Sequence, residues 1–216
     1  MSAVADGAEV VRSRDAPRTK AEILDVATRE FAAKGYTGAR VDEIAARTST
    51  TKRMLYYYFG SKEQLYVAVL ERAYSVIRSL EQELDVEHLD PEEAIRQLAG
   101  LTFDHHESHP DFIRLVSIEN VHHAQYLARS EVLPGLASTA LEVLTRILAR
   151  GAADGVFRTD VDPLDVHMMI SSFCVFRTAN RDTFNVIFER DMLAADRREH
   201  YRQMLGDLVV QYLTAR

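Results

Sequence analysis

Apolar residues recur every three or four positions along most of the chain, the spacing that places them on one face of an α-helix. The run Ile23, Ala27 and Phe31 follows this spacing, as does the later pair Leu65 and Val69. No segment alternates apolar and polar residues for long enough to indicate a strand. The pattern therefore predicts an all-α protein of about nine helices, with three short helices first, including residues 41–47 and 52–59, and longer ones after them, including residues 132–150 and 195–214.

Helix-capping signals separate these apolar runs. Thr19 with Glu22, and Ser61 with Gln64, have the spacing of a capping box, in which two side chains satisfy free backbone N–H groups. Gly35 and Gly60 are placed to end helices, since glycine adopts the left-handed conformation readily. Two further starts combine a capping aspartate with a proline in the first turn, Asp90-Pro91 and Asp162-Pro163.

Charge is distributed unevenly between the two ends of the chain. Residues 1–62 carry 11 Lys and Arg against 8 Asp and Glu, a net charge of +3, whereas residues 63–216 carry 15 against 25, a net charge of −10. A small basic end on an acidic body suits one module that binds a polyanion and a second part that avoids it. We expect three parts: a disordered arm (1–17), a basic domain that binds a polyanion (18–62) and an acidic helical domain (63–216).

Composition narrows the class of protein. Hydrophobic residues make up 47% of the chain, which is ample for a packed core, and charged residues 27%. Cys174 is the single cysteine, so an intramolecular disulfide is impossible and a reducing compartment is expected. The N-terminus lacks the apolar segment of a secretory signal, and no run of about 18 apolar residues occurs. These features predict a soluble cytoplasmic protein with no membrane partner.

Residues 41–59 predict a helix-turn-helix, in which the second helix enters the DNA major groove with its N-terminal residues at the base edges. Thr50 or Thr51 would cap that helix, and their hydroxyls could also meet a phosphate. Lys52 and Arg53 fall in its first turn. Arginine can bind guanine O6 and N7 together, and lysine can reach guanine or phosphate.

Three consecutive tyrosines follow, and they cannot all face one core because neighbouring helical residues point about 100° apart. Leu55 and Phe59 are four apart and are expected to face inward. We predict that Tyr57 and Tyr58 contact DNA, and that Tyr56 is partly packed and partly directed at phosphate. The alternative is that the tyrosines pack against neighbouring helices.

Two more basic residues flank this region. Lys62 falls in the first turn of the next helix, where the free N–H groups and the positive end of the helix dipole already favour a phosphate. Arg40 directly precedes the first helix of the motif. We expect both side chains to contact the DNA backbone.

Residues 19–66 resemble the DNA-binding domain of the tetracycline-repressor (TetR) family of bacterial transcription regulators. The resemblance depends on about 48 residues in register, among them Ile44-Ala45, Leu55 to Phe59 and Ser61-Lys62-Glu63. Where the family usually has glycine and a small apolar residue in the turn, this chain has Thr48-Ser49-Thr50-Thr51. The resemblance implies a regulator, most often a repressor, that binds a palindromic double-stranded DNA operator as a homodimer and is released by a small-molecule inducer. It makes residues 18–62 the DNA-binding domain and residues 63–216 the domain for ligand binding and dimerisation.

The family also dimerises through its last two long helices, and the last predicted helix carries a suitable apolar stripe. A stripe of this kind could equally be part of the core of one chain. The residues expected at the dimer interface are Tyr201, Met204, Leu205, Leu208, Val209 and Tyr212.

Polar and aromatic residues in the middle helices could line the inducer pocket, since a small-molecule site combines apolar walls with a few polar groups. Each of them could instead be an ordinary core or surface residue. An arginine in an apolar cavity needs an anionic partner, which is either Glu119 or an inducer with an apolar body and a negative group. The candidates are Phe103, His106, Phe112, Arg114, Glu119, Asn120, His123, Phe173 and Arg177.

Enzyme motifs and cofactor signatures are missing from the sequence, so we expect no catalytic residue and no cofactor. His105 and His109 have the spacing of two metal ligands on one helix face, but Pro110 follows His109 directly and no cysteine is near. We therefore expect no metal site. Two alternatives stay open: a DNA-binding regulator without a small-molecule ligand, and a helical metal-dependent enzyme.

Overall fold

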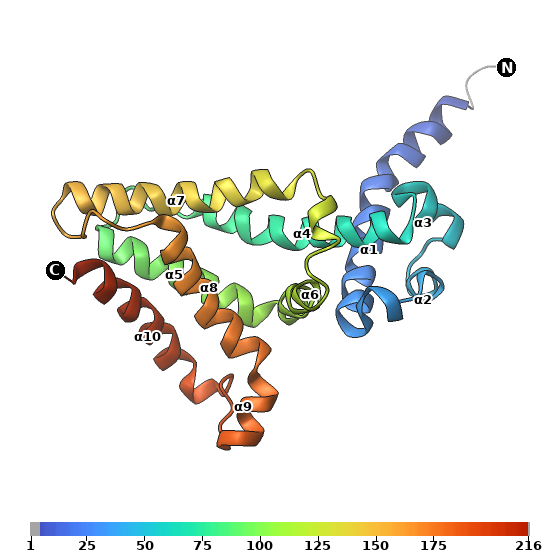
Figure 1. Cartoon of the computed structure of the whole chain (residues 1–216). Coiled ribbons are helices and arrows are strands. Elements are labelled where there is room, and N and C mark those ends of the chain that lie inside the picture. The colour runs from blue at the N-terminus through green and yellow to red at the C-terminus, as the bar shows by residue number, and fades with distance from the viewer. Residues whose placement is uncertain (1–4, 216) are drawn as a thin grey trace. The chain divides into compact units, whose positions relative to one another are not determined.

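The computed structural model describes residues 5–215, with the backbone alone at residues 5–15, 137, 139 and 140. All regular elements in this part of the chain are helices (Figure 1), which confirms the all-α prediction. None of these helices has both the length and the apolar content that crossing a bilayer requires. The elements are α1 (Ala5–Gly38), α2 (Val41–Ala46), α3 (Lys52–Phe59), α4 (Lys62–Glu83), α5 (Pro91–Ser108), α6 (Pro110–Val121), the 3₁₀ helix η1 (Leu127–Arg129), α7 (Leu133–Ala153), α8 (Pro163–Ala179), α9 (Arg181–Phe188) and α10 (Ala195–Thr214).

Several helices begin where the capping signals predicted. The hydroxyl of Ser61 accepts a hydrogen bond from the Gln64 N–H at 3.0 Å, at the start of α4. The carboxylate of Asp90 accepts from the Glu93 N–H at 3.0 Å, and Asp162 accepts from Leu164 at 2.8 Å. These bonds satisfy backbone donors that have no partner within the helix.

The first helix differs from the prediction at its start. We predicted a disordered arm over residues 1–17, whereas α1 begins at Ala5; residues 1–4 lie outside the described part. Alanine, glutamate and arginine make up half of residues 5–16 and favour a helix. Near its other end α1 is interrupted at Gly35, whose φ of 67° and ψ of 176° are not helical. The predicted break at this glycine is therefore present.

The prediction of about nine helices missed α9, which we had read as a looser stretch before the last helix. Three consecutive apolar residues of α9, Val186, Ile187 and Phe188, are more than 60% exposed. Phe184, Ile187 and Phe188 have helical spacing, but α9 spans only eight residues and no side chain caps its N-terminus, so the pattern was too short to be recognised as a helix.

The described chain divides into two compact units. The first, here called the head unit, comprises residues 5–72 and 114–130. It contains the predicted DNA-binding domain, 18–62, together with part of α4, part of α6 and η1. Ile23, Phe31 and Ile44 are fully buried in it, and α2 packs against both α1 and α3.

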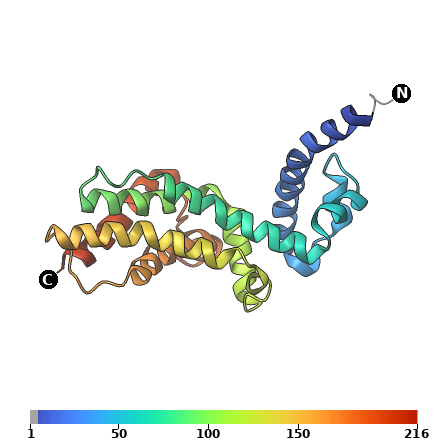
Figure 2. The ribbon, with the colours of Figure 1, turned by 90° about the horizontal axis from the view of Figure 1, so that it is seen from above.

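The second unit, here called the body unit, comprises residues 73–113 and 131–215. Helix α5 is central to its packing, since α5 contacts α10, α8 and α7. Figures 1 and 2 both show α10, in red, beside α5, in green. The core contains Phe103 from α5, Leu144 from α7, Ile170 from α8 and Val209 from α10.

Candidate nucleic-acid interface

The exposed face of α3 is the centre of the candidate interface. Helix α3 begins at Lys52 because the hydroxyl of Thr51 accepts a hydrogen bond from the Met54 N–H at 3.3 Å. Leu55 on its inner side is fully buried, and Gly60, at a φ of 73°, ends the helix. Since one side is fixed in the core, the opposite side has a defined orientation.

The turn before α3 is held by a glutamate of α1. Glu22 Oε1 accepts a hydrogen bond from the Ser49 N–H at 2.7 Å, and Oε2 accepts one from the Ser49 hydroxyl at 2.5 Å. These two bonds lower the pKa of Glu22, so the carboxylate is charged at neutral pH. The residues that replace the family's usual turn thus bond to α1, and a sequence pattern within the turn could not reveal this.

A second glutamate of α1, Glu30, binds the residues at both ends of α2. It is almost fully buried and bonds Lys34 at 2.8 Å, Arg47 at 3.3 Å and the Arg40 N–H at 3.4 Å. Burial alone would raise the pKa of Glu30, but these partners outweigh it and the pKa is lowered. Our prediction missed Glu30 because its partners come from three separate points in the sequence.

Most of the predicted DNA-contacting side chains are accessible on this face. Tyr57 is 77% exposed and Tyr56 38%, whereas Tyr58 is half-buried, with Lys20 Nζ 5.8 Å from the centre of its ring. Thr51, Lys52, Arg53 and Arg40 are exposed, and Thr50 is half-buried.

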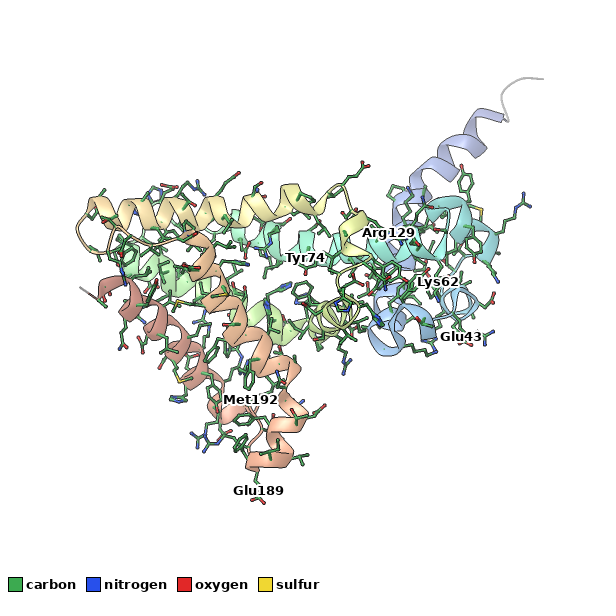
Figure 3. All side chains as sticks on the ribbon, in the orientation of Figure 1. Glu43, Lys62, Tyr74, Arg129, Glu189 and Met192 are labelled. Atoms are coloured by element: carbon green, nitrogen blue, oxygen red, sulfur yellow. The ribbon has the colours of Figure 1, made fainter. Side chains whose placement is uncertain are left out.

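Two of the predicted basic contacts are already engaged with neighbours. Lys52 Nζ lies 2.8 Å from Asp42 of α2, and this hydrogen bond and charge raise the lysine pKa. Lys62, labelled in Figure 3, is half-buried, with Nζ 4.8 Å from the centre of the Tyr36 ring. Burial lowers the pKa of Lys62. Both would have to exchange these contacts for a phosphate or base.

An aromatic cluster lies beneath Lys62 within the head unit. Tyr36 packs against Tyr126 at 4.2 Å between ring centres and against Tyr66 at 5.4 Å. Burial and the nearby charge of Glu119 raise the pKa of the Tyr66 hydroxyl. Glu119, buried on α6, accepts hydrogen bonds from the N–H groups of Tyr126 at 3.3 Å and Leu127 at 3.0 Å.

The structure divides the nine predicted pocket residues between the two units. Arg114, Glu119, Asn120 and His123 lie in the head unit, and all but Glu119 are exposed. Because Glu119 binds backbone N–H groups there, our suggestion that it pairs with Arg177 is wrong. The body unit holds the other five: Phe103, His106, Phe112, Phe173 and Arg177.

Arg177 has its anionic partner within the body unit. Its Nη2 lies 2.7 Å from Glu107 Oε2, its Nε donates to the Met192 carbonyl at 2.9 Å, and its guanidinium lies 4.1 Å from the centre of the Phe103 ring. A buried arginine that is already paired does not require a negative ligand. Arg177 therefore gives no reason to expect an anionic inducer.

The other three body-unit candidates lie in two places. His106 Nδ1 is 2.8 Å from the Thr102 carbonyl, and its ring packs edge-on against Phe112. Phe173 lines, with Arg177, a cavity of about 600 Å³ between α8, α9 and α10. Among the described residues, no group of three or more His, Cys, Asp or Glu could hold a metal ion.

The residues predicted for the dimer interface separate into core and surface. Leu205 and Val209 are buried in the body unit, Tyr201, Met204 and Tyr212 are half-buried, and Leu208 is 47% exposed. Because Leu205 and Val209 pack inside one chain, the intrachain alternative is correct for these two positions. Three large apolar residues of α8 are also exposed: Leu164, Met168 and Phe176.

Comparison with known proteins matches both parts of the chain to family models. Residues 23–69 match the model described as "Bacterial regulatory proteins, tetR family", and residues 91–209 match "Tetracyclin repressor-like, C-terminal domain". The chain is 34% identical over 203 residues to the HTH-type transcriptional repressor NicS of Pseudomonas putida, which covers 94% of this chain and 96% of that protein.

Two further similarities agree with these matches. HTH-type transcriptional repressor SCO4008 of Streptomyces coelicolor is 36% identical over 109 residues, covering 50% of this chain and 53% of that protein. Among solved structures, SCO4942 from Streptomyces coelicolor has a TM-score of 0.67 at 27% identity, covering 90% of this chain and 98% of that one.

Proposed function

This chain belongs to the TetR family of bacterial transcriptional regulators, and on that premise we propose that it is a homodimeric repressor whose operator binding is relieved by a small molecule. The observation that carries the proposal is the exposed face of α3, where Arg53 and Tyr57 project from a helix fixed by Leu55 and capped by Thr51. The repressor NicS, similar over nearly the full length, supports repression.

In this proposal α3 lies in the major groove and Arg53 binds a guanine edge. Tyr57 offers its ring to sugar or a thymine methyl and its hydroxyl to a phosphate. Lys52, Lys62 and Arg40 supply phosphate contacts, which give affinity that depends on salt but carry no sequence information. Two such heads in a symmetric dimer would read a palindrome, because protein and operator then share a two-fold axis.

Release by an inducer requires that the ligand bind one conformation better than the other. The head unit contains residues through which a change could reach the DNA contacts. Tyr126 packs on Tyr36, Tyr36 lies under Lys62, and Glu119 holds the backbone of Tyr126. A shift of the segment after α6 would therefore alter the surroundings of a DNA-contacting lysine.

A mobility-shift assay with the DNA beside the protein's own gene tests this function. We expect a complex that survives excess unrelated competitor DNA and that dissociates with at least one of a panel of small metabolites. A specific complex that no metabolite affects would favour the alternative of a regulator without a small-molecule ligand. Binding no tighter than to competitor DNA would contradict repression at that site.

A further inference from the structure

His105 of α5 is a buried side chain that lacks hydrogen-bond partners. It is only 4% exposed, and neither ring nitrogen has a partner among the described residues. A neutral imidazole offers one donor and one acceptor, and leaving both without partners in the interior is unfavourable. A group of this kind requires an explanation, and one explanation is a ligand that supplies the missing partner.

The surroundings of His105 are aromatic. The His109 ring is stacked on it, with 4.1 Å between centres and 21° between planes, and the Phe112 ring lies 5.6 Å away at a steep angle. Tyr74 of α4, labelled in Figure 3, packs edge-on against Phe112. Of these rings, His105 and His109 line a cavity, and a flat ring with polarised edges favours stacking or edge-on contact with another flat ring.

A cavity of about 660 Å³ reaches His105 from between α4, α5 and α10. This volume lies within the usual range for small-molecule sites. Its apolar walls include Leu80 of α4, Leu84 directly after α4, and Leu101 of α5, and Gly206 of α10 also lines it.

Most charged side chains that line the cavity are paired with an opposite charge, and Glu93 accepts a hydrogen bond from Gln97. Asp104 binds Arg198 and Arg202, and Arg96 binds Asp207. Burial, followed by the nearby His109, His106 and Arg78, lowers the pKa of His105 to about 3, so the ring is uncharged at neutral pH. A ligand charge placed beside His105 would lose its hydration without gaining an opposite charge.

We propose that this cavity binds a small, uncharged, planar ring compound carrying an amide or hydroxyl group, and that His105 hydrogen-bonds to that group. The inference rests on the proposed function in one respect, namely that this compound acts as the inducer. It replaces the anionic inducer expected from the sequence, because Arg177 is paired within the protein.

Benzamide and benzoate form a matched pair of probes, alike in shape but differing in charge. We would measure their binding to the full-length protein by ligand-observed NMR without DNA, using wild type, His105→Phe and the control His88→Phe at an exposed position. Benzamide should bind wild type and His88→Phe equally. It should bind His105→Phe roughly three- to tenfold more weakly, the effect of one lost hydrogen bond. Benzoate should bind wild type more weakly than benzamide does.

Two controls keep the result decisive. His105→Phe should melt at or above the wild-type temperature, because it removes two polar atoms without partners and keeps a ring. His105→Gln, which restores a donor and an acceptor, should recover part of the benzamide affinity. If His105 had a structural role alone, His105→Phe should instead melt below the wild-type temperature.

Equal benzamide binding by wild type and His105→Phe would overturn the proposal, as would benzoate binding as tightly as benzamide or no saturable benzamide binding at millimolar concentration. Because the assay contains no DNA, its outcome is independent of operator binding. A protein that fails to bind operator but binds benzamide through His105 would refute the proposed function and leave the site intact.

Discussion

Single charged residues with their partners in place carry the main electrostatic constraints in this protein. Glu22 and Glu30 hold the turn and α2 from α1, and Arg177 binds Glu107 beneath the Phe103 ring. Each is a charged group with its opposite charge or backbone partner in place, which is the arrangement that makes burial of a charge tolerable. Two predictions follow at this scale.

Replacement of Arg177 should destabilise the body unit. Arg177→Met removes the partner at Glu107 and the donor to Met192, and breaking a buried pair costs about 3 kcal/mol or more. Glu107 keeps Arg198 at 3.1 Å, so we expect a loss at the lower end, about 3 kcal/mol of unfolding free energy. Chemical denaturation checks this, with Arg146→Met, at an exposed pair with Glu87, as the control that should change little. A loss no larger than the control's would show that the pair is not stabilising.

Acid should weaken the fold through two buried histidines. Burial chiefly lowers the pKa of His105 to about 3 and of His106 to about 4, whereas both lie near 6.5 in the unfolded chain. Between these values only the unfolded state binds the proton, so the unfolding free energy falls as the pH drops below 6.5. The slope is up to about 1.4 kcal/mol per pH unit for each histidine.

Denaturation curves at fixed protein concentration between pH 7.5 and 5 measure this slope. His105→Phe should lower the slope by up to about 1.4 kcal/mol per pH unit, the contribution of one proton, relative to wild type and to His88→Phe. The comparison cancels the carboxylates that also titrate in this range. If His105→Phe and His88→Phe have the same slope, His105 binds its proton equally well in the folded and unfolded states.

At the scale of elements, the sequence predicts most of the helices correctly because their ends carry capping residues. Helix α3 was predicted at its observed bounds, since Thr51 and Gly60 mark its two ends. Helix α9 was missed because it spans only eight residues and no side chain caps its N-terminus. The roles of Glu22, Glu30 and Glu119 were not predictable from pattern, because their partners are distant in sequence or are backbone groups.

The candidate sites show the same limit. The accessible residues of α3 follow from helical angles alone, so their exposure could be anticipated. The pocket candidates could not be grouped, because sequence position does not reveal that Glu119 and Arg177 lie in different units. The exposure of Leu164, Met168 and Phe176 on α8 could not be anticipated, because apolar residues at this spacing are also found on a buried face.

The cap of α3 gives a prediction for one element. Thr51→Ala should remove the bond to the Met54 N–H and cost about 1 kcal/mol of unfolding free energy. Thr51→Ser keeps a hydroxyl at the same position and should behave nearly as wild type. Thermal unfolding followed by circular dichroism distinguishes the two variants. If Ala and Ser variants melt alike, the hydroxyl does not cap α3 in solution.

At the scale of the whole molecule, binding of a palindromic operator requires two copies of the chain to act together. Leu208 is 47% exposed in the single chain, so a charge there should spare the core of the protomer. Leu208→Glu should nevertheless dissociate the dimer, because it would bury an unpaired charge at the interface. Gln203→Glu, an exposed position on another side of α10, is the matched control.

Analytical ultracentrifugation of Leu208→Glu should show monomers, whereas the Gln203→Glu control should sediment as a dimer. Monomers should bind the operator poorly, since one head buries too little surface for tight specific binding. An intact Leu208→Glu dimer would move the interface away from this face of α10.

In the proposed function, α3 recognises a DNA sequence through Arg53. Fluorescence-anisotropy titration of wild type and Arg53→Ala tests this role most directly. Each protein is titrated against the operator and against unrelated DNA at one fixed salt concentration, since affinity depends on salt. We predict that Arg53→Ala binds the operator more weakly by roughly ten- to hundredfold, the effect of losing a contact with a guanine edge. Binding to unrelated DNA should weaken much less. Equal operator affinity of the two proteins, or an equal loss on both DNAs, would contradict the assignment of Arg53 as a base-reading residue.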